Sequence, residues 1–171
     1  MNMVKQNLRI CGGIFLSVFM FMIVFTVHFT VDAASISASK VSHNEKENRY
    51  TYQGLVKASI DNMSITSSRA TWKPKEKLFT ASDGVVFKVN GISMQSGSLS
   101  IIEKTLKADL SGDVLFHVQG LTVTSGNATY DEKSGTIAFN GGVKISQSGS
   151  KKFYNSAVYI LIEKRFTQFK E

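Results

Sequence analysis

The sequence predicts an all-β domain, an elongated antiparallel jelly roll of about five repeats that follows an apolar N-terminal helix. Three observations predict it: a period of about 29 residues, alternating apolar and polar side chains within each period, and glycine or turn residues at the same place in each. A fixed period in this range is typical of stacked repeat architectures. The 171 residues are 43% hydrophobic and include a single proline, as expected for one folded domain.

The first block of each period has the pattern of a half-buried strand. Four segments start one period apart, with apolar residues at the first, third and fifth positions except at Gln147, and mostly Lys, Ser or His between them. Such alternation directs one row of side chains into a core and the other into solvent. The segments are 56–60, 85–89, 114–118 and 143–147. The glycines just before them, which predict a turn or bulge, are Gly54, Gly84, Gly112, Gly141 and Gly142.

A second block keeps the same period but changes face partway along. Its sixth residue has the opposite parity from its first, so we expect the strand to bend near Gly97, Gly126 and Asn155. We expect the spacing between the last two copies of this block to be one residue longer than the other spacings. This makes Phe153, Val158 and Ile160 core positions. The earlier core positions expected in this block are Ile36, Val41, Ile65, Ala70, Trp72, Met94, Leu99, Ile101, Val123, Ala128 and Tyr130.

Residues 1–33 have the pattern of an export signal, which leaves 34–171 as the folded domain. Lys5 and Arg9 precede an unbroken apolar run over 14–27, and small residues lie just before position 34, as a signal peptidase requires. The alternative is an uncleaved membrane anchor, because residues 10–31 carry no formal charge and about 20 apolar residues span a bilayer. Either way, the domain faces an extracytoplasmic space.

The exported part is basic and has no thiol. Cys11 is the only cysteine, and the residues after position 33 include 18 Lys or Arg against 12 Asp or Glu, a net charge of +6. Disulfides and thiolate metal sites are therefore excluded from the domain. A basic exported domain suits phosphorylated glycolipids or anionic membrane surfaces, although the same charge also serves solubility.

The residues offer no catalytic constellation, and we do not expect an enzyme, a cofactor or a metal site. The domain holds two histidines: His43 lies in a polar stretch, and His117 lies at an outward strand position between Phe116 and Val118. Neither has a carboxylate pair, a nucleophile or a second ligand at a useful spacing. A nucleic-acid partner is not expected either, because Trp72 and a few tyrosines do not make a stacking platform.

The strings 112–118, 121–131 and 135–143 resemble the repeat of the OstA-like family, which includes LptA and LptC, periplasmic components of the lipopolysaccharide transport bridge. The resemblance extends over residues 36–166 and depends on the phased repetition. It implies a twisted jelly roll with a V-shaped cross-section, whose apolar interior holds acyl chains while sugars and phosphates stay outside. It also implies that copies join edge to edge between inner and outer membrane and catalyse no bond change.

Two roles within that family fit. A cleaved signal resembles the soluble LptA-like bridge of the periplasm, whereas an intact apolar segment resembles the LptC-like subunit anchored in the inner membrane. The implied partners are lipopolysaccharide or a related glycolipid, other Lpt components, and copies of the chain itself. A rival of another class is a structural or scaffolding β-repeat protein whose core is closed and holds no lipid.

The resemblance implies that some of the inward-facing side chains of the two blocks line a lipid groove. The alternative is that all of them form an ordinary core. The candidates, chosen among the inward positions, are Phe87, Met94, Leu99, Phe116, Val118 and Val123. Candidate phosphate contacts on the opposite strand faces are Lys57, Lys88 and Lys144, for which plain solvation is the alternative.

Overall fold

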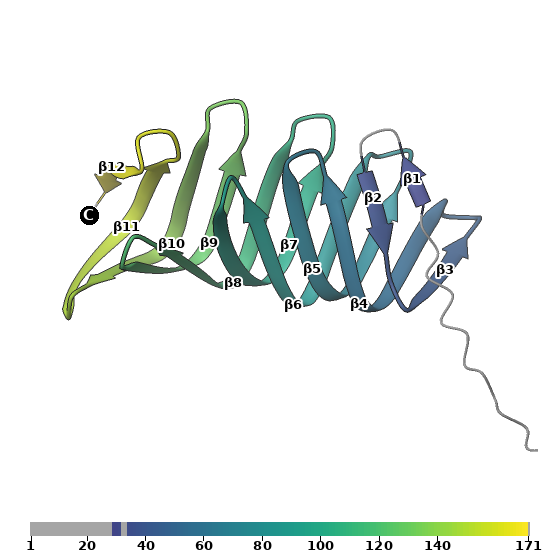
Figure 1. The fold of residues 1–171 in the computed structure, drawn as a ribbon, viewed down its shortest axis with the longest axis horizontal. Helices are drawn as coiled ribbons and strands as arrows, with labels where there is room; N and C mark the ends of the chain where they lie inside the picture. The colour runs from purple at the N-terminus through teal and green to yellow at the C-terminus, as the bar shows by residue number, and fades with distance from the viewer. Residues whose placement is uncertain (1–28, 32–33, 171) are drawn as a thin grey trace, which may run out of the picture.

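The computed structural model describes residues 29–31 and 34–170. They form one 12-stranded antiparallel sheet in which the strands follow one another in chain order, except that β2 and β3 both pair with β4. The strands are β1 (Phe29–Val31), β2 (Ala34–Ser37), β3 (Lys40–Asn44), β4 (Arg49–Ile60), β5 (Met63–Lys73), β6 (Leu78–Val89), β7 (Ile92–Ile102), β8 (Lys107–Val118), β9 (Leu121–Asp131), β10 (Thr136–Gln147), β11 (Ser150–Ile160) and β12 (Arg165–Lys170). They stack along the long axis of the molecule from β1–β3 to β12 (Figure 1).

The sheet is folded along its length into two facing walls. Wall A contains residues 34–37, 56–67, 85–96, 114–125 and 143–154, whose strands are joined by two-residue turns. Wall B contains residues 40–53, 69–82, 98–111, 127–140 and 156–170, joined by four-residue turns. The expected all-β jelly roll is confirmed. It arises from a continuous meander bent over on itself, and each long strand contributes to both walls.

The corner between the walls is a bulge in β4, β6, β8 and β10. Each of these strands has one residue more than its neighbours at the corner and two successive residues with positive φ. In β8 these are Gly112 (φ 78°) and Asp113 (φ 52°). A glycine reaches this region without strain, so the bulges lie where the sequence has glycine. The glycines therefore lie inside long strands and do not precede short ones.

The intervening strands turn the same corner with a buried serine. The hydroxyls of Ser67, Ser96 and Ser125, at the same position in successive repeats, each donate to the backbone carbonyl two residues ahead at 2.9 Å. Each bond satisfies a polar side chain that burial would otherwise penalise. The expected bend near Gly97 and Gly126 is thus present, and Gly126 lies so close to Gly141 that an added Cβ would sit 3.0 Å from its carbonyl oxygen.

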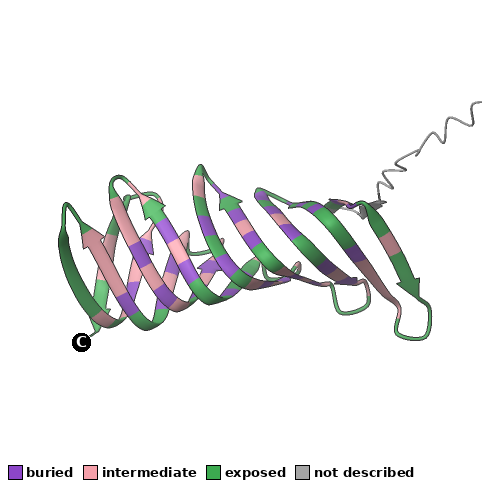
Figure 2. Cartoon of the chain, turned by 90° about the horizontal axis from the view of Figure 1, so that it is seen from below, coloured by how far each residue is buried: buried purple, intermediate pink, exposed green. Residues whose placement is uncertain are grey.

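The core lies between the walls as continuous rows of side chains across the strands. One row on wall A runs through Phe87, Met94, Phe116 and Val123, which are register partners in turn and are fully buried. Buried and exposed residues alternate along the strands, as banded in Figure 2. Full burial of side chains of this size stabilises the fold by about 1.5–3 kcal/mol each.

The N-terminal expectations fall largely outside the described residues. The apolar helix and the cleavage site belong to residues 1–28 and 32–33. Residues 29–31, which the sequence places in the export segment, form strand β1 against β2, with Thr30 opposite Ser35. In the described part of the chain, no helix is long and apolar enough to cross a membrane.

The last repeat departs from the expected spacing. Ala157 and Tyr159 are the buried residues of β11 and keep the phase of Ala128 and Tyr130 in the repeat before. The prediction of a longer spacing before the last copy of the second block is therefore wrong. Phe153 is 70% exposed on the outside of wall A. The reason is the strand register. Ala157 pairs with the buried Phe139, and because side chains alternate along a strand, Val158 and Ile160 point outward. The latter two are half-buried.

Candidate functional site

The interior opens at the C-terminal end of the molecule into an apolar recess of about 310 Å³. The recess takes residues from the tips of wall A and from the last strand of wall B. It is lined by Leu121, Ile145, Gln147, Ser150, Lys152, Tyr154, Phe166 and Phe169. In Figure 1 the β10–β11 turn bends away from the β11–β12 turn at this end. The recess is therefore an extension of the core in which side chains remain accessible.

Two phenylalanines of β12 form one side of this recess. Phe166 and Phe169 lie three residues apart, and an irregularity at Gln168 (φ 54°) lets both rings face the same side, with centroids 6.2 Å apart. Phe166 packs on Tyr159 at 4.9 Å, and Phe169 packs on Tyr154 at 4.5 Å. Phe169 remains 45% exposed, so the recess has an accessible aromatic rim.

A cation lies beside these rings. Lys152 is the register partner of Ile145, so it has the inward parity and lines the recess with the aromatic residues. Its side chain is exposed, which suits an ammonium group that keeps its charge in water while its methylene stem covers apolar surface. The arrangement of an apolar recess with one cation at the rim suits an amphiphile with an anionic head.

The candidate lipid residues occupy the closed part of the core. Phe87, Met94, Phe116 and Val123 form the wall A row described above, and Leu99 is buried on wall B. Val118 is half-buried at the tip of wall A, opposite Leu121, and is thus the candidate whose register partner lines the recess. That these six residues contact lipid stays a prediction.

The middle of the interior is closed by rings from both walls. Phe116 of wall A lies 5.3 Å from Phe139 and 5.2 Å from Tyr159, both on wall B. Phe87 lies 5.7 Å from Tyr130. Aromatic pairs at these separations pack favourably beyond the area they bury. A guest between the walls must separate these contacts, whereas the side chains that line the C-terminal recess are already accessible.

On the side opposite the corner, the two walls meet through the β4–β5 and β9–β10 turns. Burial and the neighbouring Asp61 carboxylate raise the pKa of Glu132 above its usual value. Burial also raises the pKa of Tyr130, which Asn62 opposes by hydrogen bonding. One carboxyl oxygen of Glu132 is buried without a hydrogen-bond partner. Asp61 and Asn62 of wall A thus meet Tyr130 and Glu132 of wall B.

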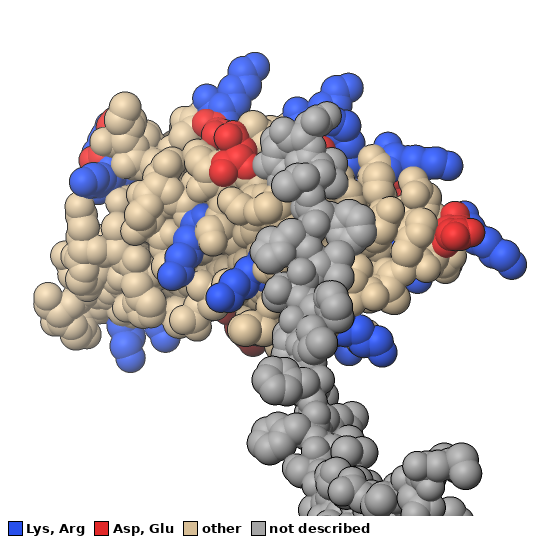
Figure 3. Space-filling model, turned by 45° about the vertical axis from the view of Figure 1, so that its right-hand side comes forward, with Lys and Arg blue, Asp and Glu red and all other residues tan. Residues whose placement is uncertain are grey.

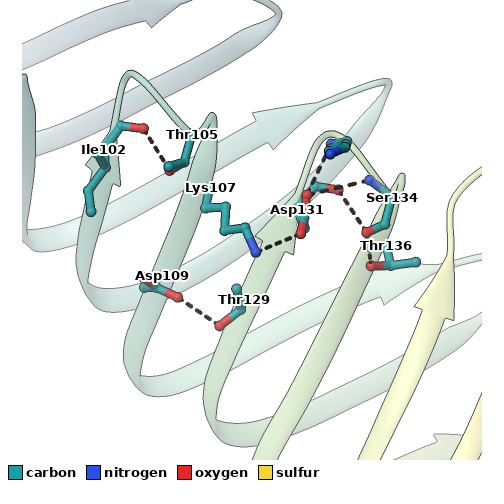
Figure 4. A network of polar contacts seen from close by, with 9 residues as sticks. Ile102, Thr105, Lys107, Asp109, Thr129, Asp131, Ser134 and Thr136 are labelled. Atoms are coloured by element: carbon teal, nitrogen blue, oxygen red, sulfur yellow. Dashed lines mark hydrogen bonds and ion pairs between the residues drawn. The ribbon is translucent and has the colours of Figure 1, made fainter.

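A polar recess of about 580 Å³ lies on the outer face of wall B. Its hydroxyls pair with one another: Thr71 with Thr80 at 2.5 Å and Ser98 with Ser111 at 2.7 Å. The Thr129 hydroxyl donates to the Asp109 carboxylate at 2.7 Å (Figure 4). These three side-chain contacts join neighbouring strands and so stabilise the sheet.

The candidate phosphate contacts lie on the outer face of wall A, away from the recess. Lys57 and Lys88 are exposed, and Lys144 is half-buried. His117 lies on the same outer face, with Nδ1 3.1 Å from the Thr122 hydroxyl. Among the described residues no three His, Cys, Asp or Glu side chains gather into a possible metal site.

The sequence reasoning missed Lys152, Phe166 and Phe169. Phe166 keeps the phase of the buried Ile137 one period earlier, but Phe169 follows the exposed Asn140 by one period, and the irregularity at Gln168 breaks simple alternation. Lys152 stands at a position that is apolar in earlier copies. The sequence signal for this site was the pair Phe166 and Phe169, two aromatic residues in a segment that is otherwise polar.

Solved structures with a similar architecture exist. The chain is similar to LptH of Pseudomonas aeruginosa, described as the LptA-homologous periplasmic component of the conserved lipopolysaccharide transport device, with a TM-score of 0.56. The match covers 70% of this chain and 92% of that one at 10% identity. The fold is LptA-like. No family model matches the sequence, and no curated protein matches it, so the likeness is one of architecture.

Proposed function

We propose that this chain is a non-catalytic carrier of lipopolysaccharide or a related glycolipid, with acyl chains held between its two walls in the manner of LptA. The observation that carries the proposal is the C-terminal recess, where the apolar interior becomes accessible beside the Lys152 ammonium. Acyl chains gain about 0.8 kcal/mol for each methylene transferred from water into such a site. The LptA-like fold supports the same function.

The proposed setting is the periplasm, where copies of this chain or other Lpt components add to its open sheet ends. Strand β12 pairs with β11 alone, and β3 pairs with β4 alone, so each end of the described sheet offers unpaired backbone groups. Such edges accept further strands. A soluble bridge and a subunit anchored through residues 1–33 both remain compatible with these edges.

A lipid co-purification experiment tests the carrier function. The chain is purified from a bacterial envelope, and bound lipid is identified by native mass spectrometry and lipid extraction. Phe169→Glu introduces a carboxylate at the rim of the recess, and Ile102→Glu is the matched control because Ile102 is 46% exposed on the outer face. Glycolipid is expected with the original chain and the control, and its loss is expected with Phe169→Glu.

The second candidate function is a structural or scaffolding repeat protein. The ring contacts of Phe116 with Phe139 and Tyr159 across the walls favour it, because they close the middle of the interior. Under this function the purified chain carries no glycolipid, and Phe169→Glu leaves assembly unchanged.

A further inference from the structure

The outer face of wall A carries cations without carboxylates. On β2–β11 its outward positions include Lys57, Lys88, Lys144 and Lys151 and no Asp or Glu. From β4 to β10 the lysines extend over roughly 30 Å, at about 4.8 Å for each strand crossed. Their neighbours in the sheet are mostly Ser and Thr, so the longer lysine side chains rise above the surface between them. Figure 3 shows Lys and Arg rising singly from a largely uncharged face.

Six cations of wall B and its turns have ion-pair partners, whereas the outward lysines of wall A have none in the described part of the chain. Lys107 lies 2.8 Å from Asp131 (Figure 4), and this contact lowers the pKa of Asp131. Lys77 approaches Glu103 at 3.6 Å. The ion pairs within the described residues all involve a cation of wall B or of the turns along it. Wall A's four outward lysines form none, so their field is not neutralised within the molecule.

An exposed aromatic ring stands among these lysines. Phe153 is 70% exposed, is the register partner of Lys144, and lies two residues from Lys151. Together with Thr124 and Asn155, Phe153 and Lys144 line a shallow outer recess of about 720 Å³. Basic side chains around an exposed apolar ring are typical of surfaces that settle at the interface of an anionic bilayer.

We propose that the outer face of wall A docks on the surface of an anionic phospholipid bilayer, with Lys57, Lys88, Lys144 and Lys151 over the headgroups and Phe153 inserted between them. This is separate from the proposed cargo site, because the docking residues lie outside the sheet and the recess lies inside it. Attraction to an anionic leaflet corresponds to about fivefold in affinity for each lysine close to the surface. A nucleic acid suits this face less well, because one phenylalanine provides no run of stacking platforms.

Lysine footprinting on the full chain tests the docking face directly. The chain, as it accumulates after expression with its own N-terminal segment, is mixed with vesicles of phosphatidylglycerol and phosphatidylcholine or of phosphatidylcholine alone. It is then treated with an amine-acylating reagent and analysed by mass spectrometry. Lys75, Lys104, Lys133 and Lys164, in the turns along wall B, are the internal controls. Because each lysine is read separately, membrane insertion of residues 1–33 does not obscure the result.

The expected result is slower acylation of the four wall A lysines with the anionic vesicles, no such change at the turn lysines, and loss of the protection at high salt. Equal protection of both sets, or no protection, overturns the proposal. So does protection by short DNA fragments in the absence of protection by vesicles, since it identifies a nucleic acid as the partner.

Matched charge variants provide the second measurement. Replacement of Lys57, Lys88, Lys144 and Lys151 by Gln is expected to weaken the extra binding to anionic over neutral vesicles by at least about tenfold. Replacement of Lys75, Lys104, Lys133 and Lys164 by Gln makes the same change in net charge and is expected to retain that binding. An equal loss in both variants contradicts a defined docking face. Phe169→Glu, which alters the recess and not this face, is expected to keep the preference for anionic vesicles, which separates this inference from the carrier function.

Discussion

The ring of Phe116 on wall A lies 5.2 Å from the ring of Tyr159 on wall B, in an edge-to-face arrangement. The two residues come from β8 and β11, which are not neighbours in the sheet. Their contact therefore exists only because the sheet is folded over on itself. Phe116 also contacts Phe139 and is fully buried, so it joins the two walls.

Phe116→Ala is expected to lower the free energy of unfolding by about 3–5 kcal/mol, because it removes a buried ring and leaves a cavity between the walls. Urea denaturation followed by circular dichroism measures it. Phe153→Ala is the control, since Phe153 is 70% exposed and its replacement is expected to change stability by less than about 0.5 kcal/mol. Equal effects of the two substitutions contradict the assignment of wall A's faces.

Gly126→Ala is expected to destabilise the corner by about 1–3 kcal/mol. The added Cβ would lie 3.0 Å from the carbonyl oxygen of Gly141, and backbone on a neighbouring strand cannot move aside easily. Gly97→Ala provides a graded comparison, because its nearest contact, with Gly112, is 3.4 Å. Thermal unfolding should rank the original chain first, Gly97→Ala second and Gly126→Ala last. The reverse order would mean that the corners do not stack as described.

Tyr159→Phe is expected to leave stability unchanged or to raise it. The Tyr159 hydroxyl is buried without a hydrogen-bond partner, and burial raises its pKa, so its removal abolishes an unfavourable burial of a polar atom. Chemical denaturation at neutral pH is the measurement. A loss above about 1 kcal/mol would indicate that the hydroxyl has a partner in solution.

Glu132→Gln is expected to stabilise the chain at neutral pH. Burial and Asp61 raise the pKa of Glu132 in the folded state, so folding favours its protonated form. The contribution of the Glu132 carboxyl to the free energy of folding is most favourable below its ordinary pKa, about 4.3. This contribution is lost as the pH rises through the raised pKa of the folded state. The stability difference between variant and original should shrink on acidification. A difference that grows towards low pH contradicts this sign.

Much of the fold could be predicted from periodicity, because each repeat contacts its neighbours in the same way. The inward positions of Phe87 and Phe116 and the corner near Gly126 follow from the phase alone. The position of Gly112 within a strand could not be inferred, because a turn and a bulge both favour glycine. The contact of Phe116 with Tyr159 was equally inaccessible, because the offset of one wall on the other is set by packing and not by the repeat.

The candidate site was the least predictable part, since it lies where the repeat ends. Phe169 has no apolar counterpart in the earlier copies, and the face that it shares with Phe166 depends on the irregularity at Gln168. The large central residues favoured from the sequence, such as Phe87, are the best buried ones. A residue that receives a guest must remain partly accessible, which composition and alternation do not distinguish from a core position.

Site-specific photo-crosslinking in cells shows whether the recess holds glycolipid. A photoreactive phenylalanine analogue is placed at Phe169, 45% exposed in the recess, and at Ile102, 46% exposed on the outer face, and adducts are probed for glycolipid. Adducts of lipopolysaccharide or a related glycolipid are expected at Phe169 and not at Ile102. Glycolipid adducts at Ile102 alone, or at neither position, would contradict the carrier function.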